Sequence, residues 1–226
     1  MDNATFKREL RDLRKTFDLE NHPFINLVHE GKATREHLKR YSVEHYEMTI
    51  RDAGALMAQA YLEMLPLDRD GARMVAQNFA EEALGLYTKS NGHADLMHEF
   101  WRDGLGLPLE ELEHSSPSPA ARAFNADIWR ICRAKPRYIG TLGMAEGCER
   151  AAYRKMFEGV TTHYGMTPEA ARFFSVHVEA DEEHEETGHK LVDQLIRDDY
   201  ERREFVAEAA VMLDLFRKGF DAMMVV

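Results

Sequence analysis

The chain has 226 residues, enough for one sizeable hydrophobic core without division into domains. Its 29 lysines and arginines against 40 aspartates and glutamates give a net charge of −11, which argues against nucleic acid or an anionic membrane surface as a partner. No apolar run approaches the ~20 residues of a membrane span, the charged N-terminus lacks a signal-peptide core, and two cysteines make no disulfide framework. We therefore expect a cytoplasmic protein.

Helical periodicity dominates the chain, and no stretch has the pattern of a strand. Capping and breaking residues, among them Thr34 and the pair Ser118-Pro119, mark the expected helix ends. In chain order the expected helices cover 6–17, 24–30, 35–64, 68 or 70 to about 85, 93–105, 119–134, 137–164, a helix opened by 167–169, and 201–223. These ranges predict one all-α domain, residues 1–226, with seven to nine helices.

The helix that follows Thr167 carries three titratable side chains on one face. His177, Asp181 and His184 are spaced as H-x3-D-x2-H, so steps of four and three keep them in one narrow stripe. The same stripe continues through Ala170, Phe174, Leu191 and Leu195. Such an apolar seam faces the interior, where charge is costly unless it is paired or ligates a metal. We therefore predict that the triad binds a transition metal, whereas the surrounding glutamates and His189 fit a solvated acidic face.

The expected helix 137–164 offers a fourth ligand. Glu146 lies in its apolar seam, and small neighbouring residues allow another helix to approach closely. A buried carboxylate without a partner would be protonated or destabilising, so we predict that Glu146 is a ligand. Glu149 shares the seam but is followed by Arg150, which favours a salt bridge for Glu149.

The segment 78–101 offers two more ligands, Glu82 and His93. They are eleven residues apart, which on an unbroken helix is ~16 Å, too far to share a metal cluster. The break at 90–92 removes this objection, because the chain can turn there and bring His93 back. Periodicity does not separate Glu81 from Glu82, and His98 lies at a more exposed angle than His93.

The full predicted set is Glu82, His93, Glu146, His177, Asp181 and His184. Three carboxylates and three imidazoles from four helical segments suit two metal ions better than one, since a single ion would leave several of them buried without partners. The competing interpretation is a pH-sensitive polar network that contains no metal.

The order Asn78-x3-Glu82, His93-x2-Leu96, Glu146 and H-x3-D-x2-H resembles the haem-oxygenase-like diiron oxidases, which are related in fold to TenA and PqqC. The resemblance extends from about Thr34 to Leu195 and implies a seven-helix bundle with the six residues as ligands. It also implies two ferrous ions (with manganese as the alternative), O2 as co-substrate and an external electron donor. The implied activity is oxidation of a small amino-acid-like or fatty-acid substrate, by desaturation, C–C cleavage or N-oxygenation, through a peroxo-diferric intermediate.

Three other functions remain open on the same fold. One is a metal-free PqqC-like oxidase or a TenA-like hydrolase, the latter with a cysteine nucleophile, for which the chain offers Cys132 and Cys148. The second is a self-sacrificing 4-aminobenzoate synthase, for which the candidate rings are Tyr41, Tyr46, Tyr138 and Tyr153. The third is a non-catalytic iron-binding protein. The residues expected to contact a small-molecule substrate are Tyr41, Tyr46, Tyr153 and Arg150, and a homodimer is left open as the assembly.

Overall fold

The computed structural model describes the backbone of residues 1–225 and the side chains of 1–178 and 188–225. The helices are α1 (Asn3–Lys15), α2 (Pro23–His29), α3 (Arg35–His45), α4 (Ala53–Met64), α5 (Arg69–Leu84), α6 (His93–Glu99), α7 (Leu109–Glu113), α8 (Pro119–Ala134), α9 (Gly140–Glu146), α10 (Glu149–His163), α11 (Arg172–Leu195) and α12 (Asp199–Ala222). Short 3₁₀ turns, η1 (Leu19–Asn21) and η4 (Pro136–Tyr138), and π-helical turns, η2 (Tyr46–Ile50) and η3 (Phe100–Gly104), complete the structure. The backbone described here contains no strand, which confirms the predicted all-α class.

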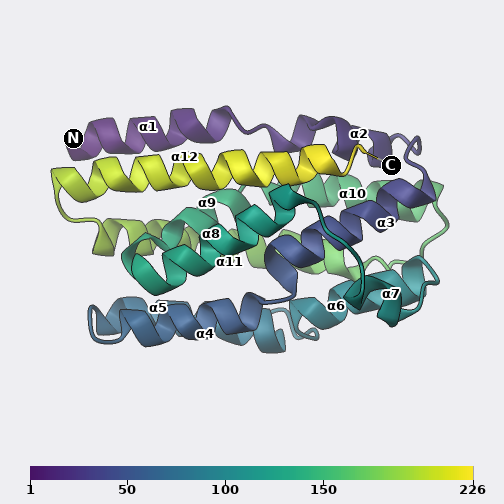
Figure 1. Cartoon of the computed structure of the whole chain (residues 1–226), viewed down its shortest axis with the longest axis horizontal. Coiled ribbons are helices and arrows are strands. Elements are labelled where there is room, and N and C mark those ends of the chain that lie inside the picture. The colour runs from purple at the N-terminus through teal and green to yellow at the C-terminus, as the bar shows by residue number, and fades with distance from the viewer. Residues whose placement is uncertain (226) are drawn as a thin grey trace.

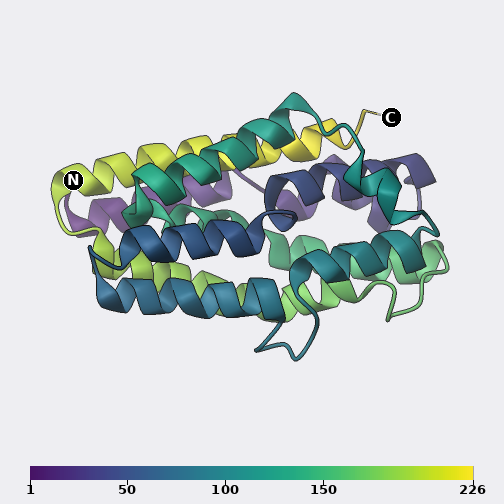
Figure 2. The same ribbon diagram turned by 60° about the horizontal axis from the view of Figure 1, so that its bottom comes forward.

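The helices form an elongated bundle, with the N-terminus and the C-terminus of the chain at opposite ends of its long axis (Figure 1). α1 lies alongside α12 on one side, and α4 pairs with α5 on the opposite side, an arrangement that Figure 2 shows from a second direction. One continuous cluster of buried apolar side chains fills the space between them. α9, α10 and α11 pack against one another within this bundle, and α11 also contacts α5 and α6.

The capping signals of the sequence set the helix ends as predicted. The Thr34 hydroxyl accepts a hydrogen bond from the backbone of His37, and the Ser118 hydroxyl caps α8, which opens with Pro119. Asp68 caps α5, and Gly85 ends it with φ +59°, a left-handed conformation that glycine adopts at little cost.

Two of the long helices expected from the sequence are interrupted. The segment 35–64 contains the π-helical turn η2 between α3 and α4. The segment 137–164 breaks at Gly147 and Cys148 into α9 and α10, where the guanidinium of Arg14 from α1 donates a hydrogen bond to the Gly147 carbonyl. That distant donor satisfies a backbone acceptor at the break, so the carbonyl needs no helical partner. The short helix α7, in the expected connection 106–118, was not predicted.

Across the described part of the chain, every helix is too short or too polar to cross a lipid bilayer.

Candidate metal centre

The chain turns back after α5 and brings His93 to the end of that helix, as the break at 90–92 predicts. Nδ1 of His93 lies 2.9 Å from Oε2 of Glu82, and Nε2 lies 3.7 Å from Oε1 of Glu81. Gly92 makes the return possible, because a Cβ there would lie 2.5 Å from the carbonyl oxygen of Ala83 on α5. His93 is fully buried, so it sits in the interior beside two carboxylates.

The structure gives Glu81 and Glu82 different surroundings. Glu81 accepts hydrogen bonds from the Tyr87 backbone N–H (2.6 Å) and from the backbone and hydroxyl of Thr88, so it anchors the loop between α5 and α6. Burial acts to raise the pKa of Glu81, but hydrogen bonds from His93, Thr88 and Tyr87 outweigh it and lower the pKa to about 2. Because the loop occupies the Glu81 oxygens, the arrangement favours Glu82 as the ligand.

His177 lies inside the bundle, as the apolar seam of α11 predicts. Only 5% of the residue is exposed, and its ring centroid lies 4.2 Å from that of His93 and 5.1 Å from that of Tyr153. Nδ1 of His177 is 2.7 Å from the Phe173 carbonyl oxygen, to which it donates, so in the neutral ring Nε2 carries the lone pair. A ring held in this way is prepared to ligate through Nε2.

The other members of the triad, Asp181 and His184, lie outside the described side chains. The seam residues on both sides of them are buried: Ala170, Phe174, Leu191 and Leu195.

A second buried group comprises Glu149, Tyr153 and His45, and the sequence interpretation missed its role. The Tyr153 hydroxyl donates to Oε1 of Glu149 and accepts from Nε2 of His45, 2.8 Å away. Glu149 is 3% exposed and makes no ion pair with Arg150, so the predicted salt bridge is wrong. The break before α10 makes Glu149 the first residue of a new helix whose Tyr153, Met156 and Val160 face the core. The spacing of four, three and four residues from Glu149 to Val160 was the signal in the sequence that indicated a buried position for Glu149.

The two buried clusters influence each other electrostatically. Burial, reinforced by the negative charges of Glu146 and Glu82, raises the pKa of Glu149 well above its usual value, although the Tyr153 hydrogen bond acts to lower it. Burial lowers the pKa of His93, but attraction to Glu82 and hydrogen bonds to both Glu81 and Glu82 raise it overall to about 10. Burial lowers the pKa of His45 to about 3.

These donors fit a metal ion chemically. Glu149 is a buried carboxylate with no lysine or arginine partner in the described structure, and a divalent cation nearby would supply the missing positive charge. Neutral imidazoles and carboxylates are the ligand types that non-haem iron takes. Within residues 1–178 and 188–225, no three His, Cys, Asp or Glu side chains converge closely enough to hold an ion by themselves.

The remaining predicted residues lie at different depths. Glu146 ends α9, is partly buried, and lines a cavity of about 20 Å³ between α4, α5, α9 and α11. Tyr41 is fully buried, with its ring stacked on that of His45 at 5.3 Å. Tyr46 is partly exposed and bonds to His98 over 3.1 Å, away from His93. Arg150 is partly buried next to Glu149 in the chain.

Neither cysteine has the surroundings of a nucleophile. Burial raises the pKa of the Cys132 thiol to about 12, and the Cys148 thiol donates to the Met144 carbonyl oxygen at 3.3 Å. The environment of both thiols therefore disfavours the alternative of a cysteine-dependent hydrolase.

Comparison with known proteins gives relatives for the sequence and for the fold. A 4-aminobenzoate synthase from Chlamydia muridarum is 27% identical over 190 residues, which are 80% of this chain and 75% of that protein. A domain of unknown function with a heme-oxygenase-like fold from Shewanella denitrificans aligns with a TM-score of 0.76 at 19% identity, over 99% of this chain and 92% of the other. A TenA homologue from Pseudomonas syringae pathovar tomato aligns with a TM-score of 0.78 at 12% identity, with the same coverage.

The two structural alignments show that the bundle has the haem-oxygenase-like fold expected from the sequence. A family model described as "Iron-containing redox enzyme" matches residues 39–217, most of the chain and all of the predicted ligand positions. The protein therefore belongs to this family of iron-containing redox enzymes.

Proposed function

We propose that the protein is an O2-dependent non-haem iron oxidase that binds two iron ions. The proposed ligands are Glu82, His93, Glu146, His177, Asp181 and His184. The observation that carries the proposal is the buried group of carboxylates and imidazoles from α5, α6, α10 and α11, in which His93 lies 2.9 Å from Glu82 and its ring lies 4.2 Å from that of His177. Iron bound there would supply the electrons that activate O2.

The residues around the proposed centre orient its ligands. Phe173 fixes the His177 ring through its carbonyl oxygen, and Glu81 holds the loop that returns His93 to Glu82. Phe173 and Phe174, both fully buried, pack beside His177 and Tyr153 and keep bulk water away from them. The pair His45 and Glu149 holds the Tyr153 hydroxyl at a fixed place near His177, where it can hold or move a proton.

Iron binding tests the proposed centre. The metal-free chain would be loaded with Fe(II) without oxygen, desalted and analysed for iron, and we expect two equivalents per chain. His177→Ala and Glu82→Gln should each lower this content strongly, because each removes a ligand. His98→Ala is the matched control, since His98 lies on the same helix as His93 but bonds to Tyr46 instead, and it should retain both ions. Full iron content in both ligand variants would contradict the assignment.

Oxygen uptake tests the reaction. The iron-loaded protein would be exposed to O2 alone and with a panel of amino acids and fatty acids, and consumption would be followed with an oxygen electrode. We expect one class to accelerate consumption and to yield an oxidised product by mass spectrometry. Iron binding without substrate-dependent O2 consumption across the panel would favour a non-catalytic iron-binding protein.

A second candidate function is synthesis of 4-aminobenzoate from a tyrosine of the chain itself. It is favoured by the name of the Chlamydia muridarum relative and by Tyr153, whose ring lies 5.1 Å from that of His177. Tyr41 is the other buried ring nearby, whereas Tyr138 lies 6.1 Å from Phe205 and beside Lys135. Intact-mass and peptide analysis after O2 exposure without added substrate would test it.

Under this second function the peptide that contains Tyr153 or Tyr41 loses its phenol side chain, an amine donor supplies the nitrogen that replaces the ring hydroxyl, and 4-aminobenzoate accumulates at no more than one equivalent per chain. Tyr153→Phe or Tyr41→Phe then abolishes the product, and Tyr138→Phe is the matched control that retains it. An unchanged protein mass would exclude self-sacrifice and leave the oxidase of an external substrate.

A further inference from the structure

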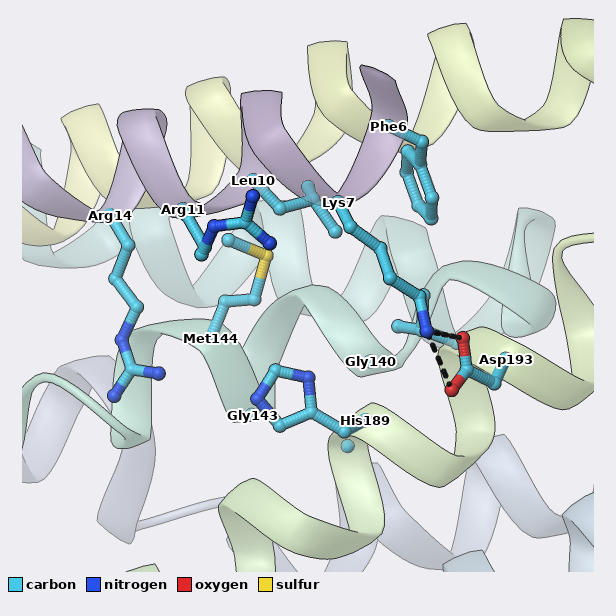
Figure 3. A pocket seen from close by; sticks show the side chains of 12 residues that line it. Phe6, Lys7, Leu10, Arg11, Arg14, Gly140, Gly143, Met144, His189 and Asp193 are labelled. Atoms are coloured by element: carbon cyan, nitrogen blue, oxygen red, sulfur yellow. Dashed lines mark hydrogen bonds and ion pairs between the residues drawn. The ribbon is translucent and has the colours of Figure 1, made fainter. Parts of the chain in front are cut away.

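A separate cavity of about 420 Å³ opens between α1, α9 and α11 (Figure 3). This volume lies within the ~300–1,000 Å³ typical of small-molecule pockets. Its walls combine basic side chains from α1 with apolar side chains from all three helices. None of the described residues that line it belongs to the predicted set of metal ligands.

One wall of this pocket is cationic. Lys7, Arg11 and Arg14 follow one another at steps of four and three, so they share one face of α1, and Figure 3 shows them extending toward α9 and α11. Lys7 pairs with Asp193 at 3.0 Å, and Arg14 donates to the Gly147 carbonyl oxygen. Arg11 forms no ion pair with any described carboxylate, so its charge is available to a ligand. Among the described lining residues the three basic side chains outnumber Asp193, and this local positive charge in a chain of net charge −11 favours an anion.

The floor of the pocket is apolar. Phe6 and Val192 are buried beneath it, with Met144 of α9 and the partly exposed Leu10 of α1 beside them. An apolar body placed there would leave water, while an acidic end would reach the guanidinium of Arg11. This combination suits a molecule with one anionic end and one apolar body.

Three glycines separate the pocket from the interior. Gly140, Gly143 and Gly188 line the pocket and also line the small cavity that contains Glu146. A Cβ on Gly188 would lie 3.4 Å from the Cα of Gly143, and one on Gly140 would lie 2.8 Å from Val192. Because the wall is only backbone at this crossing of α9 and α11, a ligand in the pocket lies one helix layer from the proposed metal centre.

We propose that this pocket binds a small amphipathic carboxylate, with its apolar part against Phe6, Leu10 and Met144 and its carboxylate at Arg11. The further step, that the bound molecule is held there for the iron centre as a substrate, rests on the proposed function. The binding itself depends only on the pocket.

Calorimetric titration of the full-length, metal-free chain with octanoate tests the binding. We expect saturable binding of one octanoate, weakened by added salt because the contact is ionic and exposed. Octan-1-ol has the same body without the charge and should bind about tenfold more weakly, which corresponds to the loss of one charge-assisted contact. Equal affinity for the alcohol, or no binding of octanoate, would overturn the proposal.

Two exposed arginines of α1 provide a matched pair of variants. Arg11 lines the pocket and Arg8 does not, and neither pairs with a described residue. Arg11→Ala should weaken octanoate about tenfold, whereas Arg8→Ala should leave the affinity unchanged. Leu10→Trp should block binding by filling the apolar part, with a thermal melt to verify that the variant is folded. Equal effects of Arg11→Ala and Arg8→Ala would show that octanoate responds to the overall positive charge of α1. That result would overturn the proposal that it binds in the pocket.

Oxygen uptake of the iron-loaded chain separates this inference from the proposed function. Octanoate binding that depends on Arg11 without faster O2 consumption supports the pocket and rejects its role as a substrate site. Fe(II) binding with O2 consumption on another substrate, combined with no octanoate binding, rejects the pocket and leaves the oxidase standing.

Discussion

Two buried glutamates of this protein, Glu44 and Glu149, are satisfied in different ways. Glu44 on α3 is fully buried, pairs with Arg40 at 2.6 Å, and accepts hydrogen bonds from the backbone N–H and the hydroxyl of Ser118. Glu149 on α10 is 3% exposed, and its one hydrogen-bond partner among the described side chains is the Tyr153 hydroxyl, with Nε2 of His45 at 3.9 Å.

The difference separates a structural carboxylate from a candidate functional one. Glu44 has a cation and two further donors, the backbone N–H and the hydroxyl of Ser118, and it ties α3 to the first turn of α8. Glu149 has no lysine or arginine partner among the described residues, so we expect a proton or a metal ion to compensate its charge. Burial alone therefore does not distinguish the two carboxylates; the cationic partner of Glu44, which Glu149 lacks among the described side chains, does.

Removal of Glu44 should have the largest effect on stability. Glu44→Ala leaves Arg40 without its partner and the start of α8 without two acceptors, and a broken buried pair costs ~3 kcal/mol or more. Urea unfolding of the metal-free protein should show this loss, while iron bound per folded chain stays at the wild-type level. A loss below ~1 kcal/mol would mean that the pair contributes no more than a surface salt bridge.

A pH effect of intermediate size should come from His45 beside Tyr153. Burial lowers the pKa of His45 from 6.5 to about 3 in the folded state. The unfolded chain therefore binds the proton first, so the stability that neutral His45 contributes is complete above pH 6.5 and decreases as the pH falls toward 3. At ~1.36 kcal/mol per pH unit, the loss between pH 6.5 and 5.0 is ~2 kcal/mol.

His45→Leu should flatten this dependence, because leucine cannot bind the proton. Unfolding free energies of both proteins would be measured with a chelator present, so that loss of metal does not contribute. Parallel curves for the wild type and the variant would show that another group carries the acid sensitivity.

Local signals made much of the fold predictable. The caps Thr34 and Ser118 act within one turn of their helices, and Gly92 permits the chain reversal that brings His93 to Glu82. The apolar seam of α11 likewise predicts the burial of His177, because it depends only on helical spacing.

Contacts between distant segments were not predictable in the same way. The break between α9 and α10 involves Arg14, which lies 133 residues earlier than Gly147, and that break makes Glu149 the first residue of a new helix. The pocket lined by Arg11 depends on how α1 packs over α9 and α11, which no spacing within one helix encodes.

The smallest effect on stability should come from Glu149→Gln. The same substitution at Glu44 provides a direct comparison between the two glutamates. Burial and the nearby charges of Glu146 and Glu82 raise the pKa of Glu149, so without metal its carboxyl is held toward the neutral form, which glutamine matches in shape. The amide oxygen still accepts from Tyr153, so we expect a change within ~0.5 kcal/mol in urea unfolding at pH 6 with chelator. Glu44→Gln, the matched control, breaks the ion pair with Arg40 and should cost more.

Added Fe(II) should then separate the two variants in the opposite sense. Free Fe(II) at 100 times its dissociation constant stabilises a folded chain by ~2.7 kcal/mol. Glu44→Gln should retain that gain, because Arg40 already balances the charge of Glu44 and the metal does not need it. Bound Fe(II) should favour the deprotonated, negatively charged form of Glu149. Glutamine cannot lose a proton in this way, so Glu149→Gln should gain less stability from the metal. A Glu149→Gln protein that is strongly destabilised without metal, yet gains as much as the wild type with it, would place Glu149 among the structural carboxylates beside Glu44.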